Sequence, residues 1–251
     1  MIIKAFNLTY FLLMLLVAGI IVALTLLFKN KPRKSKEKCI LAICAFNIFL
    51  FIIYKIGLAV GTPGLPDTYH FDIWLELPIH LCNISLFLVP IGILTKNDKL
   101  MAYGFFIAPL GAFFAMTFPS EGFGGLNIFY FHMIGFYWTH AILVIVGILL
   151  VSLGLFRPTF RKIPPMFVTA LILSAGAFVI NILIREFTGS PANYFFTYEP
   201  EGISILELFW SILPVRYLYC SFAVIILAAY TCLTTLPFHL ADKKKAASQS
   251  K

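Results

Sequence analysis

Cysteine and histidine, two residue types with catalytic potential, lie in otherwise apolar stretches of this 251-residue chain. A cysteine becomes a nucleophile when a nearby histidine accepts its proton or stabilises the thiolate. Cys82 and His140 have the identities that this chemistry requires, although they are far apart in the sequence. They are the predicted nucleophile and base of a covalent catalytic site.

His80 is the competing base, because it lies only two residues before Cys82. On a regular helix, side chains at that spacing point about 160° apart, so His80 would face away from the thiol. Pro78 could perturb this geometry. We therefore predict His140 as the base and give His80 an orienting or substrate-binding role.

Further polar residues accompany this pair and could bind a substrate. Asn83, Asn181 or His80 could donate hydrogen bonds to an oxyanion, a role suited to preorganised donors. A cation could hold a phosphate, and arginine is the better bidentate partner. The candidate cations are Lys55, Arg185 and Arg216.

These residues must be positioned by membrane-spanning helices, because the composition excludes other classes of protein. The chain is 61% hydrophobic and only 12% charged, whereas an ordinary soluble domain is about 25% charged. A soluble globule would need more polar surface, and an intrinsically disordered chain would contain fewer apolar residues. The sequence therefore predicts an all-α polytopic membrane protein.

Seven stretches are long and apolar enough to span a bilayer, whose core of about 30 Å needs roughly 20 helical residues. The predicted transmembrane helices cover residues 9–28, 39–60, 74–94, 100–118, 131–155, 164–187 and 211–236. They form a single predicted domain, residues 1–240, and the basic tail 241–251 is expected to be disordered. The first stretch is too long for a signal peptide and lacks a cleavage pattern, so it is predicted to be a true span.

The formal net charge of +8 indicates topology rather than nucleic-acid binding. Most of the 19 Lys and Arg residues lie in four short segments, 29–38, 96–99, 157–162 and 243–251. Most acidic residues lie in or beside the stretches between them. Because Lys and Arg favour the cytoplasmic side, we predict a cell-membrane protein with its N-terminus outside and its C-terminus in the cytoplasm.

The predicted helices place the cysteine and the histidine at one depth. A helix rises about 1.5 Å per residue, so Cys82 lies roughly 12 Å below the outer end of the third span. By the same measure His140 lies roughly 13 Å below the outer end of the fifth. The other candidate residues also fall in outer halves of spans, and ionisable residues in a span usually face the bundle interior. The sequence predicts a polar cavity in the outer half of the bundle.

The sequence also argues against several other chemistries. The last span has no lysine for a retinal Schiff base, and its only basic residue, Arg216, cannot form one. No Cys-x-x-Cys, His-Glu-x-x-His, Walker loop or glycine-rich dinucleotide motif is present, so neither a metal nor a cofactor is predicted. The five cysteines all lie in predicted spans and are poor candidates for a disulfide framework.

The Pro-x-His-x-Cys run from Pro78 to Cys82, followed by a histidine in the fifth span, resembles a known family. It is similar to the YwaF family of bacterial integral membrane proteins, which is related to animal transmembrane protein 164, a membrane acyltransferase. The resemblance covers roughly residues 74–237. It continues at Asn193, Tyr194, Pro200, Pro214 and Tyr217.

This resemblance implies an activity and assigns roles. The animal relative moves a fatty acyl chain between phospholipids with a cysteine nucleophile and a histidine, and these roles would fall on Cys82 and His140. It implies membrane phospholipids as partners and adds Asn193 and Tyr194 to the substrate-binding or orienting residues. The sequence departs from the family pattern over residues 189–194 and at Arg216, which leaves the lipid head group open.

Other hypotheses remain open from the sequence. The same cations and amides could form a non-enzymatic binding or transport site for a small anionic solute or lipid, with Cys82 as inert packing. Transporters often show inverted repeats, and none is visible here, which favours an enzyme. Lys55 and Arg216 could snorkel to the interface, His140 could be an interhelical hydrogen bonder, and His132 is expected to be interfacial. A third hypothesis is a purely structural subunit of a larger complex, but it would not explain why the polar residues lie at one depth in the predicted spans.

Overall fold

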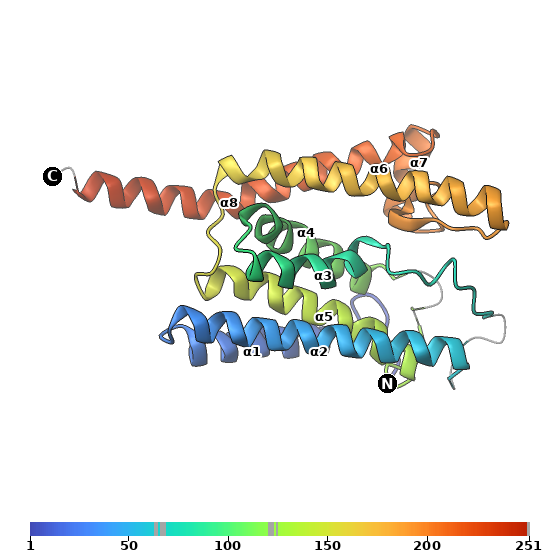
Figure 1. Ribbon diagram of the computed structural model, residues 1–251, viewed down its shortest axis with the longest axis horizontal. Helices are drawn as coiled ribbons and strands as arrows, with labels where there is room; N and C mark the ends of the chain where they lie inside the picture. Colours follow the sequence, from blue (N-terminus) through green and yellow to red (C-terminus); the bar gives the residue numbers. More distant parts are fainter. Residues whose placement is uncertain (63–64, 66–68, 120–122, 124, 250–251) are drawn as a thin grey trace.

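The computed structural model describes residues 1–62, 65, 69–119, 123 and 125–249, and its regular structure is helical (Figure 1). The α-helices are α1 (Leu8–Phe28), α2 (Arg33–Val60), α3 (Leu81–Leu94), α4 (Asp98–Thr117), α5 (Phe131–Ser152), α6 (Ile163–Thr188), α7 (Ser204–Ile212) and α8 (Ser221–Gln249). Short 3-10 turns are η2 (Phe160–Lys162), η3 (Tyr194–Phe196) and η4 (Leu218–Cys220).

Within the described residues, six helices are long and apolar enough to cross a membrane, namely α1, α2, α4, α5, α6 and α8. The shorter helix α3 is also apolar. The chain is therefore an all-α multi-pass membrane protein, as the composition predicts. The orientation remains a prediction from the charge pattern, and two of the acidic residues that carry it, Asp67 and Glu121, lie outside the described residues.

The helix pair α4 and α5 forms the centre of the bundle. A Cβ on Gly147 would lie 2.8 Å from the Gly104 carbonyl oxygen and 2.9 Å from the Pro109 ring, so glycine is needed for this close approach. Figure 1 shows α6 and α8 on one side of α3 and α4, with α1 and α2 on the other. These outer helices expose apolar side chains, as helices that face lipid do.

The third predicted span is wrong at its beginning, because α3 starts at Leu81 rather than at residue 74. Proline lacks an amide hydrogen and its ring clashes with a preceding helical turn, so Pro78 opposes a helix that enters from the loop. His80 has φ −59° and ψ 151° and lies just outside the helix. Cys82 is consequently in the first turn of α3 rather than in the middle of a longer helix.

The last predicted span, residues 211–236, also differs from the structure. Helix α7 ends at Ile212, Tyr217 has a positive φ of 64°, and α8 begins only at Ser221. Pro214 lies in this break, where it cannot supply the amide that a continuous helix would use. The tail that was expected to be disordered continues α8 as far as Gln249, and residues 250–251 lie outside the described part of the chain.

Candidate active site

Cys82 lies at the beginning of α3, where the first amide groups of a helix have no intrahelical acceptor. The Cys82 thiol donates to the Asn83 side-chain oxygen at 3.8 Å, and the backbone N–H groups of Cys82 and Asn83 lie beside the sulfur. Helix N-termini stabilise negative charge. This position therefore suits a thiolate, and the same amides could stabilise an oxyanion that forms beside it.

His140 lies in α5 and is 6% exposed. Its Nδ1 lies 2.7 Å from the Phe136 carbonyl oxygen. A carbonyl only accepts hydrogen bonds, so Nδ1 carries a proton and the neutral ring has its lone pair on Nε2. The Cys82 thiol and the His140 ring line the same cavity and are close enough to interact electrostatically. The structure thus brings together the two residues that the sequence paired, in the tautomer that a general base requires.

A cavity of about 520 Å³ opens at this pair and is large enough for part of a lipid. Five of the predicted site residues line it: Lys55, His80, Cys82, Asn83 and His140. Most of the remaining lining is apolar and comes from α2, α4, α5, α7 and α8. The cavity therefore combines a small reactive centre with a long apolar wall.

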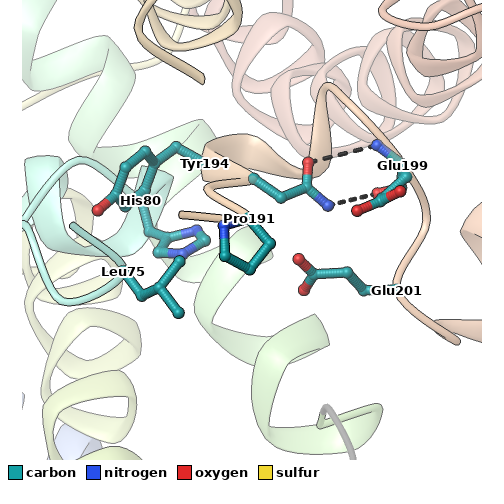
Figure 2. Close-up of a pocket in the computed structure, with 7 residues that line it drawn as sticks. Leu75, His80, Pro191, Tyr194, Glu199 and Glu201 are labelled. Carbon is teal, nitrogen blue, oxygen red and sulfur yellow. Dashed lines mark hydrogen bonds between the residues drawn. The ribbon is translucent and has the colours of Figure 1, made fainter. Parts of the chain in front are cut away.

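His80 lines the same cavity as Cys82, which corrects the expectation that it faces away. The expectation assumed a regular helix, whereas the chain is non-helical up to His80. Its ring contacts Tyr194 and Phe196, with ring centroids 4.9 Å and 5.6 Å apart. It also borders a second pocket of about 290 Å³, in which Figure 2 shows the imidazole beside Leu75 and Pro191.

Lys55 does not offer a free positive charge to the cavity. It forms an ion pair with Glu76, whose carboxylate also accepts a hydrogen bond of 2.9 Å from the Tyr69 hydroxyl. Burial, and secondarily the Glu76 carboxylate, raise the pKa of the Tyr69 hydroxyl above that of a free phenol. The predicted phosphate-binding role of Lys55 would require the Glu76 partner to be displaced.

Unlike Lys55, the residues Arg185 and Arg216 do not line the large cavity. Each arginine has partners near it in the fold. Arg185 donates to Glu199 at 2.6 Å and to the Ala192 carbonyl at 2.7 Å. Both guanidinium groups lie over the Tyr198 ring, at 3.9 Å and 4.0 Å from its centroid. These contacts hold the segment between α6 and α7, so the structure does not favour phosphate binding by either arginine.

Asn181 holds the same segment from inside the bundle, and it too lies outside the large cavity. Its Nδ2 donates at 2.9 Å to the Tyr194 carbonyl and at 2.9 Å to Thr197 Oγ1, and its Oδ1 accepts from the Tyr194 amide at 2.7 Å. Because both ends of the amide are engaged in holding the turn η3, this geometry does not favour the predicted role of Asn181 as an oxyanion donor.

The turn η3 and the residues before it also position the segment that leads into α3. The Tyr194 hydroxyl donates to the Trp74 carbonyl at 2.5 Å, and Ser190 donates to Asp72 at 2.5 Å. Asn193 donates to the Glu199 carbonyl at 2.7 Å, and with Tyr194 it lines the smaller pocket rather than the cavity at Cys82 (Figure 2). Residues far along the chain therefore position the approach to Cys82.

We expect Asn181→Leu to destabilise the protein, because it leaves the buried amide of Tyr194 without its acceptor and removes one of the donors to the Tyr194 carbonyl. Each unsatisfied buried group costs about 1–3 kcal/mol. The measurement is thermal unfolding of the purified protein in detergent, with Glu186→Gln, an exposed position on the same helix, as the control. Equal midpoints for the two variants would contradict the role given to Asn181.

Three glutamate or histidine residues that line the cavity were not among the predicted site residues. Glu76 neutralises Lys55, whereas Glu201 and His132 contribute polar groups elsewhere on the cavity wall. Glu76 and His132 could have been suspected as ionisable residues beside predicted spans. Glu201 could not, because it reaches the cavity only through the fold of the segment after α6.

The helices and the cavity define a multi-pass membrane protein in which a half-buried cysteine and a buried histidine line one largely apolar cavity. The TMEM164 family model matches residues 5–234, and the chain therefore belongs to the TMEM164 family. This family is linked to acyltransferase activity. The match does not confirm the YwaF name suggested by the motif. Neither a curated protein nor a solved structure matches the chain.

Proposed function

We propose that the protein is a membrane-embedded lipid acyltransferase or transacylase, with Cys82 as nucleophile and His140 as base. The observation that carries this proposal is that Cys82, at the start of α3, and His140, in α5, lie together on the wall of one apolar cavity. Family membership supports the reaction class. The apolar wall supports an acyl chain as the bound group, and membrane phospholipids are the proposed substrates.

The first half-reaction transfers an acyl group to the enzyme. Nε2 of His140 accepts the thiol proton, and the sulfur of Cys82 attacks the ester carbonyl carbon of a lipid. The negative charge passes to the carbonyl oxygen, which the backbone amides of Cys82 and Asn83 are placed to stabilise. Collapse of this intermediate breaks the ester C–O bond, and His140 returns its proton to the departing alcohol oxygen.

The second half-reaction releases the acyl group to another lipid. His140 accepts the proton of the incoming hydroxyl, whose oxygen attacks the thioester carbonyl carbon. The C–S bond then breaks, the new ester forms, and the proton on His140 passes to the sulfur. The enzyme returns to its starting state, and no oxidant, reductant or metal is consumed.

Transport of a small anion receives less support from the site. That hypothesis depended on free cations, but Lys55 is paired with Glu76, and Arg185 and Arg216 are engaged with the segment before α7. Among the described residues that line the large cavity, Lys55 is the only Lys or Arg. The proposed orientation would place the cavity in the outer half of the cell membrane.

An acyl-enzyme test addresses the proposal directly. The purified protein is placed in vesicles of phosphatidylethanolamine and phosphatidylglycerol whose acyl chains carry an isotope label, and the reaction is stopped with acid. We expect a labelled acyl group on the Cys82 peptide by mass spectrometry, removable by hydroxylamine as a thioester is. Acyl transfer that proceeds with no label on Cys82, or with label on Cys44 or Cys220, would contradict this mechanism.

A further inference from the structure

His132 is a buried histidine that the proposed mechanism does not use. It lies in the first turn of α5 and is 1% exposed, so its side chain is enclosed by the protein. Neither Nδ1 nor Nε2 has a hydrogen-bond partner among the residues that the structure describes. A buried polar group without a partner lowers stability, so such a group is expected to meet a ligand or water.

His132 borders the large cavity and is surrounded by aromatic rings. The residue lines the large cavity, and its ring lies between the aromatic rings of Phe123 and Tyr130, each 6.1 Å away by centroid. Below it, Phe123 stacks on Phe136 at 4.2 Å. The surrounding aromatic rings thus hold the imidazole in place but give its nitrogens no hydrogen-bond partner.

His132 and the catalytic histidine lie on one face of α5. Positions 132, 136 and 140 are successive turns of that face, and all three line the cavity. The rise of the helix places His132 about 12 Å from His140 along the axis, toward the end of the helix where the chain enters from the loop. A lipid whose ester carbonyl lies at Cys82 would therefore place its other oxygens beside the part of the cavity wall that α5 forms.

We propose that His132 is a substrate-binding residue that hydrogen-bonds an oxygen of the lipid's glycerol-phosphate part and so fixes how deeply the lipid sits. The proposal rests on the proposed acyl-transfer function. A neutral imidazole offers one donor and one acceptor, which suits ester, hydroxyl and phosphate oxygens. The nearby cation Lys55 is already paired, which leaves this recognition to hydrogen bonds rather than to net charge.

The test is His132→Phe, which keeps a ring between Phe123 and Tyr130 and removes both nitrogens. In lipid-free detergent we expect the variant's unfolding midpoint to be equal to the native value or about 2–4 °C higher, because an unsatisfied group has been removed. In vesicles we expect the KM for the lipid donor to rise about tenfold, with kcat little changed. His70→Phe, an exposed position, is the matched control.

Two donors distinguish the oxygen that His132 binds. If the KM effect occurs with phosphatidylglycerol and disappears with diacylglycerol, the phosphate is the partner; if it occurs with both, a glycerol or ester oxygen is. Either result supports the proposal. An unchanged KM with both donors, or a lower midpoint for His132→Phe, would overturn it. Loss of activity in Cys82→Ala with native kinetics in His132→Phe would overturn this inference alone and leave the proposed function standing.

Discussion

Replacing Cys82 with alanine is expected to remove acyl transfer, with a loss of rate of at least about 1,000-fold. In the proposed mechanism the sulfur carries the acyl group between the two half-reactions, so its removal abolishes the covalent intermediate. The side chain is small and lies at a helix start beside the cavity, so the truncation should leave the fold intact. The measurement is label transfer between lipids in reconstituted vesicles.

Two matched variants make this result specific. Cys44→Ala and Cys220→Ala remove other thiols, of which the first is buried and the second half-buried, and neither lines the large cavity. Both should keep native rates if they fold. Full activity in Cys82→Ala would remove Cys82 as nucleophile and would favour a binding protein in which the thiol is packing.

The second large effect is expected for His140→Gln, with a rate about 100-fold to 10,000-fold lower. Glutamine can hydrogen-bond the thiol, but it cannot accept its proton. The residual reaction would depend on thiolate that forms without a base, so its rate should rise as the pH increases through the ordinary range of a cysteine, about 8.5. The measurement is the pH profile of label transfer.

The pH profile separates a base from a residue that merely supports the fold. His239→Gln, near the opposite end of the bundle beside Phe160, is the control and should keep the native profile. A His140→Gln rate that is low at every pH, with a lowered unfolding midpoint, would assign His140 to packing instead. A native rate would contradict its role entirely.

The sequence predicted the spans well where composition alone decides them. Apolar length sets the bounds of α1, α4 and α6 to within a few residues, since a bilayer requires long apolar helices whatever their neighbours are. The beginning of α3 was missed because the non-helical approach depends on tertiary contacts. The hydrogen bond from Tyr194 to the Trp74 carbonyl joins residues that are far apart in the sequence.

The candidate site was predicted in part for the same reason. Cys82 and His140 were paired by their depth along the predicted helices. This pairing holds even though α3 begins later than predicted, because both residues line the same cavity. The local partners of the arginines could not be predicted, because a guanidinium group can pair with many different groups. That Arg185 would meet Glu199, and share the Tyr198 ring with Arg216, follows only from how the segment after α6 folds back.

The contacts from Ser190 and Tyr194 to Asp72 and Trp74 also bear on how the protein is made. During synthesis, Cys82 leaves the ribosome well before Asn181 and the turn η3, which hold the segment that leads into α3. A nascent chain halted before α6 would contain both Cys82 and His140, yet lack the contacts that hold that approach. Assembly of the proposed catalytic centre would thus be delayed until the later helices have entered the membrane.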